Sequence, residues 1–256
     1  MKITFIGLSC FLLENVQGDR LLLDPYYGDS KFGLGLKFPD DLQVDVFLVS
    51  HPDEDHSNIH SSMSRHRQDS NDHDIKENIE IFPDFNLRGT FVREWNGDIC
   101  IAFSFTIDGI RCIHLADNVH LLTKQQLQEI GNVDIVFATM PKGDLNVAID
   151  VIKQLNPRLA IPSHYIPLAK GVQKPTHDEI VTEIKKLFIA DWMKNANNND
   201  FTQNVFVTLF ENTLKLQDSF ENYKEITKTS YELTKESLPE EIGIRVFRDC
   251  VGQQIT

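Results

Sequence analysis

The chain has 256 residues, enough for one large α/β or β domain with a sizeable core. Its formal net charge of −13 at pH 7 opposes non-specific binding to nucleic acid or anionic membranes, because Lys and Arg side chains supply that attraction. No apolar stretch approaches the roughly 20 residues that a membrane-spanning helix needs. We therefore expect neither nucleic acid nor a membrane as a partner. The oligomeric state stays open.

The cysteines indicate the redox environment. Cys10, Cys100, Cys112 and Cys250 are scattered singly, with no C-x-x-C pair. The amino-terminal residues also lack the charged, apolar and small-residue order of a secretory signal. We expect a reduced, cytoplasmic protein.

The amino-terminal residues predict a β-meander. Short strands are expected at Lys2 to Ile6, Ser9 to Glu14 and Arg20 to Leu23, with a turn at Gln17-Gly18-Asp19. The apolar run Val44 to Val49 has the β-branched and aromatic content of a buried strand.

A second group of strands follows a long polar stretch. Asn58 to Glu80 has no apolar periodicity, which indicates a loop or an irregular helical excursion. Strands are then expected at Thr90 to Trp95, Ile99 to Ile107 and Arg111 to Leu115. Asp108-Gly109, between the last two, is a strong hairpin signal.

Helices and strands alternate after this hairpin. Thr123 and Asp144 are suitable helix N-caps. The expected elements are helices at Thr123 to Ile130 and Leu145 to Leu155, and strands at Asp134 to Thr139 and Arg158 to Ile161.

The remaining residues give a less regular pattern. We expect an amphipathic helix at Asp178 to Asn195 and a hairpin made of Asn204 to Phe210 and Thr213 to Leu216. Ile242 to Phe247 is a β-like run without an assigned role. We predict one domain over residues 1–217. Residues 218–256 are treated as a carboxyl-terminal extension packed on that domain.

The segment Ser50 to His56 carries the strongest functional signal. It places His51, Asp53, Asp55 and His56 directly after the buried strand that ends at Val49. A loop at the carboxyl end of a strand can direct several side chains into one space. Imidazole nitrogens and carboxylate oxygens are the ligands of zinc, manganese or iron at hydrolytic sites. The segment therefore predicts a metal site.

Two later residues extend this constellation. Asp117 follows the apolar strand that ends at Leu115, and His164 follows the apolar run that ends at Ile161. Taken alone, an Asp after a strand is usually a turn former, and a His beside Pro162 often packs or forms a hydrogen bond. Together with the first segment, however, these residues match a metal site assembled from loops on one rim of a sheet.

These motifs resemble the metallo-β-lactamase superfamily, and within it the branch of metal-dependent hydrolases similar to the ascorbate-6-phosphate lactonases. The resemblance covers roughly residues 1–167. The motifs that carry it, in chain order, are Gly7-x-Ser9-Cys10, Leu22-Leu23-Asp24-Pro25, Ser50-His51-x-Asp53-x-Asp55-His56, Asp108-Gly109 leading to His114-x-x-Asp117, and Ile161-Pro162-x-His164-Tyr165.

The resemblance implies an α/β fold, the αββα four-layer sandwich, with one or two metals on the upper edge of two sheets. It implies that Asp55, His56 and His164 hold one metal and that Asp117 bridges to another. His51 matches the first ligand of the other metal. Asp53 stands where a second histidine is usual.

The third histidine of that other metal has no counterpart. No histidine occurs between His73 and His114, and Glu94 is an oxygen ligand that could take the place. Leu8 stands where relatives usually have His, and Ala116 stands where they have Gly. Carboxylate in place of imidazole shifts the preference from zinc toward manganese or iron.

Two functions are compatible with these residues. The first is a hydrolase of a small ester, lactone or phosphodiester, in which a divalent metal, zinc by default, activates water. In that case Asp55 orients the nucleophile and accepts its proton, and Tyr165 is a candidate donor to a developing oxyanion. The second is a degenerate, non-catalytic member of the same fold that binds one metal or none.

Overall fold

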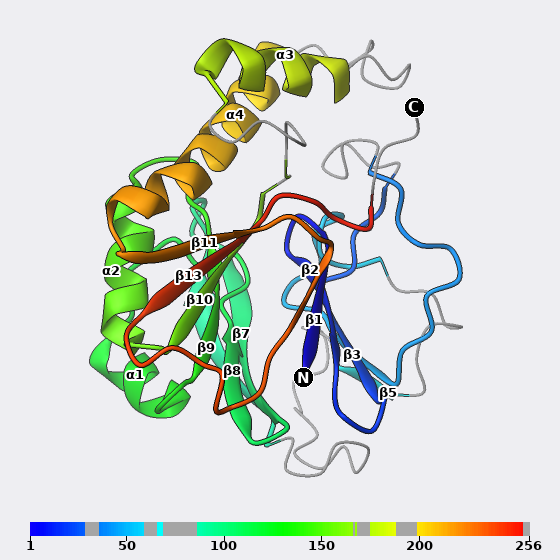
Figure 1. The fold of residues 1–256 in the computed structure, drawn as a ribbon, viewed down its shortest axis with the longest axis vertical. Helices are drawn as coiled ribbons and strands as arrows, with labels where there is room; N and C mark the ends of the chain where they lie inside the picture. The colour runs from blue at the N-terminus through cyan, green and yellow to red at the C-terminus, as the bar shows by residue number, and fades with distance from the viewer. Residues whose placement is uncertain are drawn as a thin grey trace.

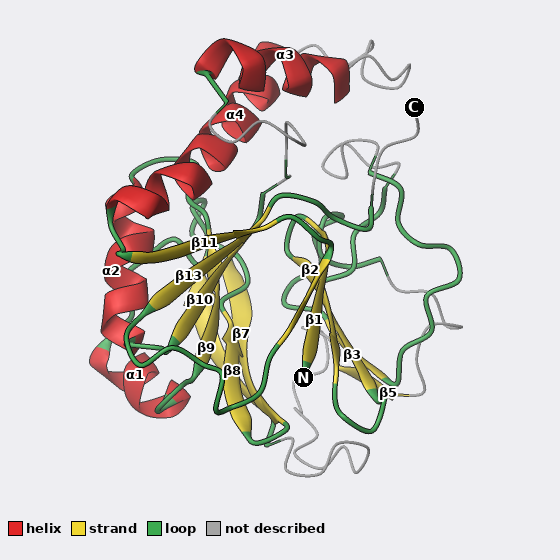
Figure 2. Cartoon of the chain, viewed as in Figure 1, coloured by secondary structure: helices red, strands yellow, loops and turns green. Residues whose placement is uncertain are grey.

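The computed structural model describes residues 1–28, 36–58, 66–68, 86–165, 167, 175–187 and 199–252. Two β-sheets lie face to face, and helices cover the outer side of the larger sheet (Figures 1 and 2). In the described part of the chain, no helix is long and apolar enough to cross a membrane.

The smaller sheet contains the amino-terminal meander. β1, β2 and β3 are antiparallel neighbours, whereas β4 and β5 continue the sheet in parallel with β3. The strand order is β12-β1-β2-β3-β4-β5. The bounds are β1 Lys2–Gly7, β2 Cys10–Glu14, β3 Arg20–Leu23, β4 Val46–Leu48, β5 His66–Gln68 and β12 Ser230–Glu232.

The larger sheet has the order β11-β13-β10-β9-β8-β7-β6. β6, β7 and β8 are antiparallel, and the remaining strands run parallel to β8. The expected hairpin turn is present, with Asp108 and Gly109 at φ 51° and 70°, which is the left-handed backbone that this short turn requires. The bounds are β6 Arg88–Arg93, β7 Ile99–Ile107, β8 Ile110–His114, β9 Ile135–Thr139, β10 Leu159–Ser163, β11 Asn222–Ile226 and β13 Gly243–Phe247.

The helices begin where the sequence predicts caps. Thr123 and Gln126 form a reciprocal capping box at α1 (Lys124–Ile130), and the Asp144 side chain accepts a hydrogen bond from Asn146 N at α2 (Leu145–Leu155). α1 packs on β6, and α2 packs on β9. α3 (His177–Leu187) and α4 (Asn199–Lys215) pack on each other, and a short 3₁₀ turn, Leu216–Asp218, follows α4.

An aromatic cluster joins the two sheets. The ring of Phe5 in β1 lies 4.9 Å from Phe11 in β2, 5.6 Å from Phe247 in β13 and 5.1 Å from Tyr165 after β10. Phe11 in turn lies 4.8 Å from Phe137 in β9. All five rings are fully buried, and such pairs add to the hydrophobic stabilisation of a core.

The predicted hairpin at Asn204 to Phe210 and Thr213 to Leu216 is wrong. These residues belong to α4 and to the turn after it. The β-branched and aromatic residues favour strands locally, but Leu209, Thr213 and Leu216 are wholly buried at helical spacing. Tertiary packing on this face therefore overrides the local β-propensity.

Two other predicted segments lie partly outside the described residues. Most of Asn58 to Glu80 lies outside them, although His66–Gln68 forms the short strand β5. Of the helix expected at Asp178 to Asn195, the part up to Leu187 is α3, and the rest is not described.

The residues after 217 contribute to both sheets. β11 and β13 extend the larger sheet, and β12 pairs with β1 at the edge of the smaller one. The division of the chain at residue 217 stays a prediction. The mixed α/β sandwich of two sheets is confirmed, with α1 and α2 packed on the larger sheet. In the described residues no helix covers the outer face of the smaller sheet (Figure 2).

Candidate metal centre

Asp24, which follows β3, holds the loop after β4 in place. Its fully buried carboxylate accepts hydrogen bonds of 2.8 Å from both the backbone N–H and the hydroxyl of Ser50. The same carboxylate lies 2.9 Å from Nδ1 of His56 and 2.7 Å from Nε2 of His114. Burial alone would raise the pKa of Asp24, but His114 and His56 hold it well below its ordinary value. Asp24 is therefore ionised and acts only as an acceptor.

This arrangement determines which nitrogen of each loop histidine faces the site. Because Asp24 only accepts, Nδ1 of His56 must be the donor. In this tautomer the lone pair of the neutral ring is on Nε2, which faces Asp55 and Asp117. The Ser50 hydroxyl donates its single hydrogen to Asp24, so its oxygen accepts a hydrogen bond from Nδ1–H of His51 at 2.8 Å. Both Nε2 atoms are thus available as ligands, as in metal sites in which a carboxylate orients the histidine.

The larger sheet supplies the opposite side of the site. Asp117 follows β8, and His164 follows β10 with the left-handed φ of 62°. Two backbone hydrogen bonds hold His164 in this unusual conformation, one from its N–H to Leu8 O at 2.9 Å and one from Leu8 N–H to Tyr165 O at 3.1 Å. Strain of this kind is common at functional sites, where surrounding structure maintains it.

Four of the predicted residues converge on one small volume. His56 Nε2 lies 3.2 Å from Asp117 Oδ1 and 3.7 Å from Asp55 Oδ2. His164 Nε2 lies 3.2 Å from Asp117 Oδ2 and 3.6 Å from the same Asp55 oxygen. Ligands about 2.0–2.2 Å from a tetrahedral zinc ion are about 3.3–3.6 Å apart. The spacing of Asp55, His56 and His164 is therefore compatible with one ion, and Asp117 turns a different oxygen toward each histidine.

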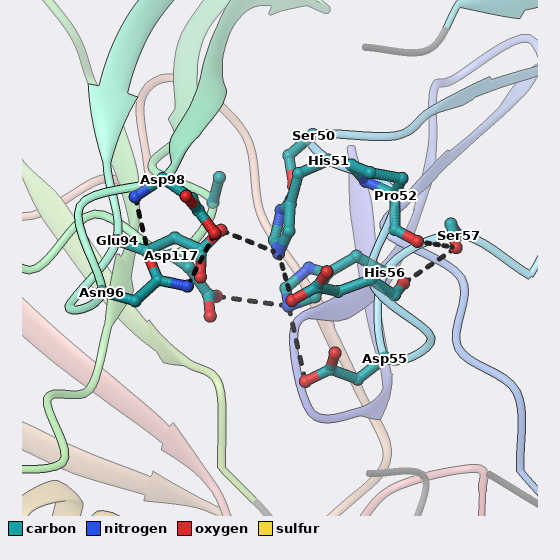
Figure 3. A network of polar contacts seen from close by, with 12 residues as sticks. Ser50, His51, Pro52, Asp55, His56, Ser57, Glu94, Asn96, Asp98 and Asp117 are labelled. Carbon is teal, nitrogen blue, oxygen red and sulfur yellow. Dashed lines mark hydrogen bonds and ion pairs between the residues drawn. The ribbon is translucent and has the colours of Figure 1, made fainter. Parts of the chain in front are cut away.

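Several ligand atoms in this cluster lack hydrogen-bond partners. His51 Nε2, His56 Nε2 and Asp117 Oδ1 are buried and have no hydrogen-bond partner among the described residues. Figure 3 shows the two imidazoles turned toward the carboxylates of Asp117 and Glu94. Buried polar atoms without partners are costly and call for an explanation such as an ion. A divalent cation bound in this cluster would give such atoms a partner.

The charges of the cluster favour a positive charge at its centre. Burial would raise the pKa of Asp117, but His164 and His56 hold it well below its usual value. Burial would likewise lower the pKa of His56, yet Asp117, Asp55 and Asp24 raise it well above its usual value. A positive charge among these carboxylates is therefore favoured, whether it is a proton on His56 or a bound metal ion.

Asp53 and Glu94 also lie beside His51. Both carboxylates approach His51 Nε2 to 3.8 Å. The two differ in exposure, because the Asp53 side chain is 56 % exposed and that of Glu94 only 6 %. Burial, followed by the charges of Asp117 and Asp53, raises the pKa of Glu94 to about 7. The structure thus places all six predicted residues in one region: His51, Asp53, Asp55, His56, Asp117 and His164.

Sequence reasoning missed the supporting residues and left the role of one other open. Asp24 and Ser50 stand in the quoted motifs, but neither was assigned a role, and their position after a strand was the only signal. Tyr165 was a candidate oxyanion donor, with packing in the core as the alternative. The core position is what the structure has, because the fully buried hydroxyl donates to Phe247 O at 2.7 Å.

Comparison with known proteins identifies the family of this chain. Residues 2–164, most of the chain and all of the site, match the model of the β-lactamase superfamily domain. The chain belongs to the metallo-β-lactamase superfamily. The narrower resemblance to ascorbate-6-phosphate lactonases stays a prediction.

Relatives and a solved structure extend this result. A UPF0173 protein of Pyrococcus furiosus is 24% identical over 192 residues, covering 64% of this chain and 83% of that protein. A UPF0173 metal-dependent hydrolase of Archaeoglobus fulgidus is 26% identical over 199 residues, with the same coverage of 64% and 83%. A Thermotoga maritima structure named for a Zn-dependent hydrolase of this superfamily has a TM-score of 0.59 at 22% identity, covering 96% of this chain and 97% of the other. This last likeness concerns the fold.

Proposed function

We propose that this protein is a metal-dependent hydrolase in which Asp55, His56, Asp117 and His164 hold a divalent ion. The observation that carries the proposal is that His56 Nε2 and Asp117 Oδ1 are buried without hydrogen-bond partners, and that His56 and His164 both lie 3.2 Å from Asp117. The name metal-dependent hydrolase in the relatives supports it. Zinc is the default ion because imidazole nitrogens make up half of this ligand set.

The chemistry follows from the positions of these residues. When bound, a divalent ion lowers the pKa of a coordinated water to about 7 and polarises the oxygen of the bond under attack. Asp24 keeps His56 in the ligating tautomer and increases its basicity. Asp55 is the least enclosed of the four, with 13 % of its side chain exposed, and is placed to orient a nucleophile and accept its proton. Asp117 and His164 close the site from the larger sheet.

The substrate class proposed is a small ester, lactone or phosphodiester. The net charge of −13 disfavours polyanionic substrates such as nucleic acid. A reduced, cytoplasmic location belongs to the same proposal, since no cysteine in the described part of the chain forms a disulfide.

The test is metal-dependent turnover of three generic substrates: an aryl ester, a small lactone and an aryl phosphodiester. We expect activity with zinc or manganese, its loss on chelation, and a loss of at least about 10³-fold in Asp55→Asn. Glu54→Gln is the matched control, because Glu54 is an exposed acid in the same loop. The competing function, a degenerate, non-catalytic protein of the same fold that binds one metal or none, is favoured by the missing third histidine and by the altered neighbourhood of Asp117. It predicts no metal-stimulated turnover in the wild type on any of the three substrates.

A further inference from the structure

A polar cleft of about 560 Å³ lies where the larger sheet faces β12 of the smaller one. It is lined from β11 and β13 on one side and from β12 on the other, and the segment after β11 crosses between the two sheets (Figure 1). This volume is in the range of small-molecule sites. We infer that the cleft binds the phosphate group of a small organic molecule through Arg245, Lys224 and Lys228. The site is independent of the proposed metal centre and shares no residue with it.

Arg245 supplies the decisive observation. It lines the cleft from β13 and is only 6 % exposed. Nη1 donates to Ile244 O at 2.9 Å, and to Asn222 O and Asn222 Oδ1 at 3.2 and 3.3 Å. Among the described residues, Nε and Nη2 have no hydrogen-bond partner, and no carboxylate lies within 4.0 Å of the guanidinium. A buried cation without a counter-charge is costly, so an anion is the partner that this position calls for.

The remaining edge of the Arg245 guanidinium has the shape of an oxyanion receptor. Nε–H and one N–H of Nη2 point the same way and can bind two oxygens of one phosphate or carboxylate group. The hydrogen bonds of Nη1 to backbone and side-chain oxygens hold the planar group in one orientation. The site is therefore preorganised, which lowers the entropic cost of binding.

Two lysines add positive charge to the same cleft. Lys224 is the register partner of Arg245 in the parallel pairing of β11 with β13, so both side chains leave the same face of the sheet. Phe247, two residues further along β13, lies on that face and packs on Phe5 of the smaller sheet. The face is thus turned toward the smaller sheet. Lys228 lines the cleft from the connection between β11 and β12.

The acids of the cleft are balanced by other cations. Glu225 forms an ion pair of 2.5 Å with Arg248, and Glu232 stands opposite Lys2 in the pairing of β12 with β1. The three cations named above therefore leave a surplus of positive charge in the cleft. A phosphate group carries a charge of about −1.5 to −2 at pH 7, so it matches this surplus better than a carboxylate does.

Tyr231 gives the cleft an aromatic side. Its register partner in β1 is the wholly buried Ile3, so its ring is on the face of the smaller sheet that is turned toward the larger one. A ring face offers contact area to an apolar or aromatic group. This position favours an organic phosphate over the free phosphate ion.

The experiment is isothermal titration calorimetry of the full chain with phenyl phosphate, inorganic phosphate and benzoate. Each titration is run with zinc-loaded protein and again in the presence of a chelator, which keeps the anions from binding to a metal ion. The variants are Arg245→Lys, Lys224→Gln and Tyr231→Ala. The control is Lys153→Gln, because Lys153 is an exposed lysine on α2. Circular dichroism checks folding, and the exposed Lys224 provides a variant that does not disturb the core.

We expect one phenyl phosphate per chain, bound equally well with and without chelator. Arg245→Lys and Lys224→Gln should each weaken binding at least about 10-fold, because each removes a charged hydrogen bond, whereas Lys153→Gln should not. Benzoate should bind at least about 10-fold more weakly than phenyl phosphate, because it carries a single charge. Tyr231→Ala should reduce the affinity for phenyl phosphate to that for inorganic phosphate.

Three results would overturn the inference. The first is no binding of phenyl phosphate to the wild type, and the second is binding that Arg245→Lys and Lys224→Gln leave unchanged. The third is binding that disappears on chelation, which would assign the anion to the metal centre and leave the proposed function standing. Conversely, a protein without metal-dependent turnover that still binds phenyl phosphate through Arg245 would support this site and not the proposed function.

Discussion

Oδ2 of Asp24 lies 2.9 Å from Nδ1 of His56, and both side chains are completely buried. The contact joins a residue at the end of β3 to a loop residue of the proposed metal site. Because the carboxylate fixes the proton on Nδ1, it controls whether Nε2 can bind metal. The first prediction tests this control.

Asp24→Asn should weaken metal binding about 10- to 100-fold without removing a ligand. An amide that donates to Nδ1 would move the imidazole proton to Nε2 and block it as a ligand. Isothermal titration with Zn²⁺ measures the affinity, and thermal unfolding of the apoprotein measures the separate structural cost. Unchanged affinity would show that Asp24 serves the fold alone.

Removing the metal should destabilise the protein in a way that depends on His164. An ion present at about 100 times its dissociation constant stabilises a protein by about 2.7 kcal/mol. We expect Zn²⁺ to raise the unfolding temperature of the wild type and chelation to reverse the gain. His164→Ala should abolish most of the increase, because it removes a ligand at the rim while leaving the aromatic core intact. An equal rise in both proteins would point to zinc binding elsewhere.

Asp134 should give the protein part of its acid sensitivity. Burial would raise its pKa, but hydrogen bonds from the side chain and backbone of Arg111 lower it below the ordinary value. A carboxylate with a lowered folded-state pKa contributes stability above its unfolded pKa of about 3.9 and loses it as pH falls through the folded value. Asp134→Asn should therefore cost about 1–2 kcal/mol at pH 7.

The difference between wild type and Asp134→Asn should shrink below about pH 4, where the wild-type carboxylate takes up its proton. Urea unfolding at several pH values measures it. Asp150→Asn is the control, because Asp150 is an exposed residue of α2. A difference that is the same at pH 7 and pH 3 would contradict the assignment.

Ala116 is a further test of the strained rim. Its φ of 52° is unfavourable for a residue with a Cβ atom, by about 1–2 kcal/mol, and glycine avoids that cost. Two effects of Ala116→Gly oppose this relief of strain. Glycine makes the unfolded chain more flexible, and the buried methyl group is lost. We expect no loss of stability and a gain of up to about 1 kcal/mol. Ala148→Gly, in the regular helix α2, should instead lose about 1 kcal/mol or more. Equal losses in denaturant unfolding would contradict the prediction.

The strand-terminal histidines and acids could be predicted from sequence because each follows a local apolar run. Asp24 could not be given its role, since its partners Ser50 and His114 are 26 and 90 positions away. Only the pairing of β3 with β4, and the packing of one sheet on the other, brings these residues together. Glu94 was recognised as a possible ligand, but its burial beside His51 is a property of the fold.

The fold was predicted best where turn and cap chemistry is local, as at Asp108-Gly109 and Thr123. It was predicted worst at α4, whose Val, Phe and Thr residues have high β-propensity. The β-like run at Ile242 to Phe247 was recognised in the sequence, but its position in the larger sheet was not predicted. Parallel pairing with β10 and β11 depends on residues distant in sequence, which a local pattern does not encode.

The pairing of β12 with β1 has a consequence for folding during synthesis. Lys2 pairs with Glu232, and Thr4 pairs with Ser230. The outer edge of β1 therefore has no partner strand until the ribosome has synthesised most of the chain. At typical rates of 5–20 residues per second, that edge stays unpaired for roughly 10 to 50 s on the ribosome. An open strand edge is a template for pairing with other chains. Variants that weaken β12 should therefore aggregate during expression even where the metal site is unaltered.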